Sequence, residues 1–194
     1  MSQLRAYRRV NASRAVSYVA AVSLRYVRCW MATETAASEF RVEKERVDAL
    51  IILSNGDSTP GHFFVAKASA HSTGPERVGE LLNAERGFFP FEMLEGPGTR
   101  TVLYNRQQVV MVALTDNEAR RDPAYDVATE RFVSLLLSSG ARITGSVRVY
   151  RPEGRDRLSD WARHADIFRY IEKGETVVLV NIAHVIEVSE VPKP

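Results

Sequence analysis

This sequence is poor in cysteine and lacks the common cofactor-binding motifs. Its 194 residues include one cysteine, Cys29, which excludes an internal disulfide and favours a reducing compartment such as the cytoplasm. The glycine-rich fingerprints of dinucleotide and nucleoside triphosphate sites are missing, as are the His-Glu-x-x-His and Cys-x-x-Cys patterns of zinc sites. We therefore expect no cofactor, no metal ion and no enzymatic activity.

An excess of basic residues is lacking outside the first thirty positions. Residues 1–30 contain six of the 26 basic residues and no acid, so the remainder has 20 basic and 24 acidic residues, a net charge of about −4. Proteins that bind a phosphate backbone normally carry a basic excess. The charge distribution therefore disfavours nucleic acid as a partner.

No apolar run is long enough to span a bilayer, so we expect no integral membrane segment. Residues 15–22 are apolar and lie between arginine-rich ends, a pattern that fits a signal peptide, a transit peptide or an amphipathic surface helix. Alternatively, translation begins at Met31 and the upstream residues are an over-extended start. We assign residues 1–44 to a leader, and export follows only if residues 1–30 are a real targeting segment.

The rest of the chain contains one pattern twice. Residues 50–65 align with residues 134–149 and share a Gly-x4-Gly spacing, while residues 102–112 align with residues 178–188 through a shared apolar pattern around one asparagine. Matched blocks in the same order indicate an internal duplication. We place the first repeat at 45–114, a linker at 115–128 and the second repeat at 129–190.

Each repeat opens with a predicted hairpin. Asn55-Gly56 lies between two apolar runs and is a strong turn signal, because its residues tolerate positive φ; Ser139-Gly140 is the equivalent in the second repeat. Five strands are expected in each repeat, with residues 88–93 and 167–171 as the third. The last two strands are joined at Asn105 and at Asn181.

One short helix is expected between the second and third strands of each repeat. In the first repeat, Ser72 or Thr73 is a candidate cap, Pro75 falls in the first turn, and the helix ends near Gly87. The expected fold is mostly β with one short helix per copy, in the order β-β-α-β-β-β. The apolar stripes that support the two helices are Val78, Leu81 and Leu82, and Leu158, Trp161, Ala162 and Ala165.

The strand motifs resemble those of the Sm-like small barrels. Residues 50–65 with 101–112, and residues 135–149 with 177–188, resemble the two motifs of that family in outline. The resemblance implies a tandem repeat of two small Sm-like barrels or strongly bent five-stranded antiparallel sheets. The Asp and Asn that follow the first motif in RNA-binding members are absent, because a helix-bearing insertion takes their place.

Asn105, Arg106 and Asn181 are the candidate binding turns, because Sm-like relatives place nucleotide contacts there. This sequence has Asn105-Arg106 and Asn181-Ile182 where the family has Arg-Gly. The alternative interpretation is that each asparagine only relieves a left-handed turn. The four histidines fall in different elements and are expected to be surface or core residues: His62, His71, His164 and His184.

Phe88, Phe89 and Phe91 are the candidate interaction edge. They flank Pro90, which has no N–H to donate to a β-ladder and so indicates an edge strand, with Phe89 exposed to a partner.

The leading functional hypothesis is a non-enzymatic assembly or partner-binding module, with a protein partner or self-association through edge strands. RNA binding through the Sm-like turns is the alternative, and an enzyme is the third class. A PilZ-type cyclic-dinucleotide receptor is set aside, because only the arginines at 41–46 suggest it and its second motif is missing.

Overall fold

The computed structural model describes residues 43–72, 74–84, 87–96, 98–150 and 156–193. Cys29, Met31 and nearly all of the predicted leader therefore lie outside the described residues. Within the described part of the chain, no helix has the length and apolar character needed to cross a membrane.

Ten strands, all paired antiparallel, dominate the structure, so the mostly β prediction is confirmed. We call β1 to β5 the first half and β6 to β10 the second half. The strands of the first half are β1 (Lys44–Leu53), β2 (Ser58–Ala66), β3 (Phe88–Glu95), β4 (Gly98–Asn105) and β5 (Val109–Leu114). Those of the second half are β6 (Thr129–Leu137), β7 (Arg142–Val149), β8 (Phe168–Lys173), β9 (Thr176–Asn181) and β10 (Val185–Glu190).

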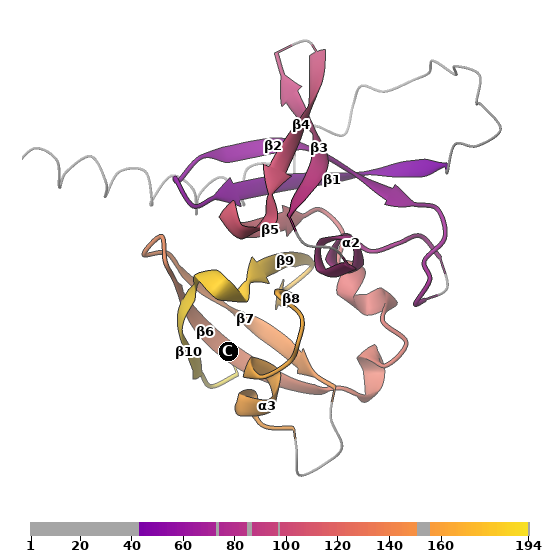
Figure 1. The fold of residues 1–194 in the computed structure, drawn as a ribbon. Coiled ribbons are helices and arrows are strands. Elements are labelled where there is room, and N and C mark those ends of the chain that lie inside the picture. Colours follow the sequence, from indigo (N-terminus) through magenta and orange to yellow (C-terminus); the bar gives the residue numbers. More distant parts are fainter. Residues whose placement is uncertain (1–42, 73, 85–86, 97, 151–155, 194) are drawn as a thin grey trace, which may run out of the picture.

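The strands form one sheet with the order β10-β6-β7-β8-β9-β5-β1-β2-β3-β4. Each half has the same internal order, in which its last strand lies beside its first strand and its fourth strand lies at the opposite end. The two halves meet where β9 pairs with β5, and Figure 1 shows these strands between the two bodies of the molecule. Among the described strands, β4 and β10 are the two ends of the sheet, which is not closed; closure of each half into a barrel stays a prediction.

Both predicted hairpins are present. Gly56 (φ 91°) and Gly140 (φ 81°) occupy the turns that join β1 to β2 and β6 to β7, where the backbone conformation favours glycine. Asn55 supports its turn because its Oδ1 accepts a hydrogen bond from the Asp57 amide at 3.0 Å.

The second glycine of each Gly-x4-Gly pair lies where two strands come very close. A Cβ atom on Gly61 would lie 2.1 Å from the carbonyl oxygen of Glu92, and one on Gly145 would lie 2.4 Å from that of Glu172. Any side chain would force these strands apart. The shared spacing therefore reflects the same close approach of β2 to β3 and of β7 to β8.

The first helix is shorter than predicted. Helix α2 spans Val78–Ala84, so Pro75 precedes it, and Ser72 is not its cap. The amides of Val78 and Gly79 instead donate to the carboxylate of Glu118, at 3.0 and 3.1 Å. Because the cap comes from a segment far along the chain, local sequence could not place the start of this helix. The second helix, α3, spans Leu158–Ala162.

The predicted interaction edge at Phe88, Phe89 and Phe91 requires correction. Strand β3 lies between β2 and β4, and Pro90 pairs with Leu103 of β4 beyond the last residues that pair with β2. Phe89 and Phe91 are buried in the core, and Phe88 alone of the three is exposed. The proline is tolerated here because it lies past the end of the β2 ladder, so β4 is the edge strand.

The hydrophobic core consists of two clusters, and each cluster contains residues of both halves. The core of the first half includes three residues of the second half, and the core of the second half includes Val110 of β5. Each half therefore completes the burial of apolar surface in the other. The three residues that enter the first core are Phe168, Val177 and Leu179.

We predict that residues 31–118 and residues 119–194 will aggregate or self-associate when produced separately, whereas the whole chain folds. The first fragment should be the less soluble of the two, because its core loses four apolar residues that lie beyond position 118, namely Ala119, Phe168, Val177 and Leu179, whereas the core of the second fragment loses only Val110. Solubility, light scattering and thermal melting measure this. Two stable monomers with cooperative melts would show that the halves are independent.

Candidate interaction site

The joint between the halves is a short antiparallel ladder with side chains buried on both faces. Leu179 and Val112, which face each other across it, are both fully buried. The joint therefore resembles the interior of a sheet rather than a contact between two surfaces. Its four residue pairs are Met111 with Val180, Val112 with Leu179, Ala113 with Val178, and Leu114 with Val177.

Asn181 closes one end of this ladder. It begins the 3₁₀ turn Ile182–His184, and its Oδ1 accepts a hydrogen bond from the Ala183 amide at 3.0 Å. Its Nδ2 donates across the joint to the carbonyl oxygens of Arg106 and Val109, at 3.2 and 2.9 Å. One buried side chain thus supports its own turn and satisfies two carbonyl groups of the other half.

His184 makes a second polar bridge over the joint. Its Nε2 lies 2.8 Å from the carbonyl oxygen of Gln107, and its Nδ1 lies 2.9 Å from the hydroxyl of Ser138. A carbonyl oxygen only accepts, so Nε2 donates to it, and in the neutral ring Nδ1 accepts from the hydroxyl.

Asn105 occupies the same place in the first half. Its φ of −75° matches the −76° of Asn181, and it begins the 3₁₀ turn Arg106–Gln108 with its Oδ1 on the Gln107 amide at 3.0 Å. The left-handed interpretation of the two asparagines is therefore wrong. Both act as caps, because extended backbone at this position lets the side chain reach the amide two residues on.

The three predicted binding-turn residues do not form one accessible site. Arg106 is buried, and its guanidinium donates to the carbonyl oxygens of Phe88 and Leu81, at 2.9 and 3.3 Å. It also lies over the Phe89 ring, 5.4 Å from the centroid. Asn181 is buried in the joint, and Asn105 alone is partly exposed.

The free edges expose residues whose counterparts are buried in the joint. Leu103 of β4 aligns with Leu179 of β9, yet its exposed fraction is 64% whereas Leu179 is fully buried. Ile186 of β10 aligns with Val110 of β5, and the corresponding values are 67% and 1%. The two ends of the sheet thus present the apolar positions that the joint uses.

Phe88 extends the same pattern beside β4. It is 61% exposed, whereas its counterpart Phe168 is 2% exposed and packs in the core of the first half. The predicted edge at Phe88, Phe89 and Phe91 missed Leu103 and Ile186. The repeat alignment contained the signal, since both are large apolar residues at positions that the repeat keeps apolar.

A buried carboxylate connects the linker to both halves. Glu118, in the 3₁₀ turn Glu118–Arg121, binds the first amides of α2 and accepts a hydrogen bond from the Tyr170 hydroxyl of β8 at 2.7 Å. Burial raises the pKa of Glu118, although hydrogen bonds from Tyr170, Val78 and Gly79 oppose that rise. The predicted linker is therefore a structural element at this point.

A second carboxylate, Glu172 of β8, is enclosed by donors. It accepts hydrogen bonds from the Tyr125 hydroxyl at 2.6 Å, from Asn117 at 2.9 Å and from Arg148 at 3.1 Å. Burial favours the protonated form, but these three donors together hold the pKa of Glu172 below its usual value. Its partners are structural, so the charge is satisfied within the fold.

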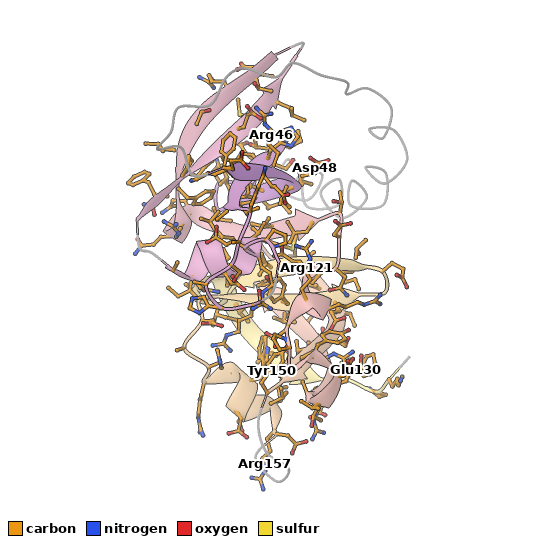
Figure 2. All side chains as sticks on the ribbon, turned by 90° about the vertical axis from the view of Figure 1, so that its right-hand side faces the viewer. Arg46, Asp48, Arg121, Glu130, Tyr150 and Arg157 are labelled. Carbon is orange, nitrogen blue, oxygen red and sulfur yellow. The ribbon has the colours of Figure 1, made fainter. Side chains whose placement is uncertain are left out.

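Two cavities offer little to a ligand. One of about 90 Å³ lies beside Trp161 and Arg169, and the guanidinium of Arg169 already donates to several carbonyl groups around α3. An open depression of about 320 Å³ is lined by charges of both signs, including Arg46, Asp48 and Arg121, which Figure 2 labels. Ligand sites are usually apolar clefts of about 300–1,000 Å³ with a few aimed polar groups, unlike either of these.

The described residues contain no group of three or more His, Cys, Asp or Glu side chains placed to hold a metal ion. The histidines occupy different surroundings, with His62 beside Asp48 and His184 at the joint.

No family model, no curated protein and no solved structure matches this chain. The joint and the two free edges, β4 and β10, are therefore the candidate functional features of this chain.

We predict that Asn181→Ala will lower the free energy of unfolding by about 1–3 kcal/mol, because it removes the two buried hydrogen bonds that Nδ2 donates to carbonyl groups across the joint. Asn105→Ala is the matched control, since it loses only the cap and should cost about 1 kcal/mol or less in dilute protein. Urea unfolding of both variants measures the difference. Equal losses would mean that the bonds across the joint contribute nothing.

We predict that Glu118→Gln will change the pH dependence of stability. With a folded-state pKa above the ordinary 4.5, the folded protein binds the proton more tightly than the unfolded chain, so ionisation of Glu118 lowers stability as the pH rises from 4.5 through the folded-state pKa. The glutamine does not titrate. The stability of the wild type relative to this variant should therefore fall over that range in urea unfolding, and a constant difference would contradict the raised pKa.

Proposed function

We propose that this protein is a non-enzymatic assembly module that binds protein partners by strand addition at β4 and β10. The observation that carries the proposal is the exposure of Leu103 and Ile186, whose counterparts Leu179 and Val110 are buried where β9 meets β5. An apolar side chain of this size contributes roughly 1.5–3 kcal/mol when it is fully buried. Covering both edges would therefore stabilise a complex substantially.

The backbone of the edges supports the same proposal. An edge strand presents unpaired N–H and C=O groups, and natural proteins usually protect such edges with charges, prolines or short strands. Strand β4 has eight residues, no proline and one charged residue, Arg100. It is therefore suited to receive another strand by main-chain hydrogen bonding, with side-chain pockets supplying specificity.

We also infer that the halves arose by duplication of one Sm-like small barrel. The same strand order, the close-approach glycines Gly61 and Gly145, and the capping asparagines Asn105 and Asn181 support this inference. RNA binding remains the less supported alternative, because Arg106 and Asn181 are buried and engaged within the fold. We place the module in the cytoplasm, on the sequence argument from the single cysteine.

The test is the mass of the full-length protein over a range of concentrations, measured by size-exclusion chromatography with light scattering, together with retention of partners from a lysate. We expect assembly or a retained partner, and we expect the double variant Leu103→Lys, Ile186→Lys to abolish both. Val127→Lys is the control, because Val127 is 83% exposed and lies outside both edge strands. A wild-type protein that stays monomeric and retains nothing would refute the proposal.

A further inference from the structure

The side-chain N–H groups that donate across the joint have counterparts at the β4 edge that bond to no described residue. Asn181 donates through Nδ2 across the joint, whereas Nδ2 of its counterpart Asn105 has no hydrogen bond to any described residue. Its Oδ1 is already used as a cap. Asn105 therefore caps its turn in the same way as Asn181, and its Nδ2 is the donor that remains for a partner at the β4 end of the sheet.

Gln108 repeats the arrangement of His184. The hydroxyl of Ser138 bonds to Nδ1 of His184, and in the first half the hydroxyl of Ser54 donates to Oε1 of Gln108 at 2.6 Å. His184 then donates through Nε2 across the joint. The equivalent donor, Nε2 of Gln108, has no partner in the described part of the chain.

The acceptors that these donors require lie at the other end of the sheet. Asn181 binds the carbonyl groups of Arg106 and Val109, whose counterparts beside β10 are those of Ile182 and Val185. The carbonyl of Gln107, which His184 binds, corresponds to that of Ala183. The β4 end therefore provides the donors of the joint and the β10 end provides its acceptors.

We infer that the partner of these edges is a second copy of this chain, with β4 of one copy paired antiparallel to β10 of the next. The inference rests on the proposed function. Nδ2 of Asn105 then donates to Ile182 and Val185 of the second copy, and Nε2 of Gln108 donates to Ala183. The register repeats the inner joint, with Tyr104 opposite Glu187, Leu103 opposite Val188, Val102 opposite Ser189, and Thr101 opposite Glu190.

The apolar residues fit the same arrangement. Within the chain, Phe168 and Leu179 of the second half enter the core of the first, and Val110 enters the core of the second. Between copies, Phe88 and Leu103 pack against the β10 end in the same way, and Ile186 packs against the β4 end. All three exposed residues become covered in one contact.

The charges favour pairing of unlike edges. Glu187 and Glu190 lie on β10, with Arg142 at 3.5 Å and Arg131 at 3.2 Å as their partners, and β4 carries Arg100, which lies 3.2 Å from Glu95 of β3. Pairing of β10 with another β10 would bring these acids together, whereas β4 brings a positive charge. Because the contact joins two different edges, a chain of copies always ends in one free β4 and one free β10. The assembly therefore grows as a filament unless these two edges meet and close it into a ring.

Two single-edge variants test the inference. Leu103→Lys blocks β4 and leaves β10 intact, and Ile186→Lys does the reverse. Each full-length variant alone should be monomeric at concentrations where the wild type assembles, and a mixture of the two should form a heterodimer and nothing larger. Adding Asn105→Ala to the Ile186→Lys chain should raise the dissociation constant of the heterodimer about tenfold, the effect of losing about 1.4 kcal/mol.

Other outcomes separate this inference from the proposed function. A single-edge variant that dimerises alone would show pairing of like edges, and a monomeric wild type that retains a different protein through β4 or β10 would show a foreign partner; both overturn the inference and leave the proposed function in place. A monomeric wild type that retains nothing overturns both. Circular dichroism of each variant, with Val127→Lys as the control, confirms that a monomer is folded.

Discussion

The pairing of β9 with β5 is the interaction on which the rest of this structure depends. It joins two five-stranded halves into one sheet, and it carries apolar side chains of each half into the core of the other. Small domains bury a low fraction of their surface, so two halves of this size gain stability from shared burial. Asn181 and His184 specify the register of the β9–β5 pairing, because their hydrogen bonds to backbone carbonyl groups of the first half form in one alignment of the strands.

Buried polar contacts tie the segment between the halves to the strands and helices on either side of it. Glu118 holds the start of α2 and the hydroxyl of Tyr170 with one carboxylate. Glu172 gathers donors from the connecting segment and from β7. Breaking either group leaves a buried charge or donor unsatisfied, which is costly in a low-dielectric interior. The segment between the halves is thus part of the packed structure.

Local signals predicted the strands and turns, but they could not predict contacts between distant residues. Asn55-Gly56 predicted its hairpin, because the turn conformation depends on the residues in it. The start of α2 was misplaced since its cap is Glu118, and Pro90 indicated the wrong edge since strand order is decided by pairing over the whole chain. The repeat matched Leu103 with Leu179, but only the structure shows that one is exposed and the other buried.

The likeness between the inner joint and the outer edges has a consequence for folding. Until β9 has docked on β5, its edge presents nearly the same surface as β4, so a neighbouring molecule competes for the place that belongs to the chain itself. The covalent connection through residues 115–128 decides the competition, because before docking it keeps the two strands near each other, and for short linkers the effective concentration reaches the millimolar range. Nascent chains that are crowded together reach local concentrations closer to this millimolar value than dilute chains do. If β9 then pairs with β5 of a neighbouring molecule, the product is a domain-swapped assembly.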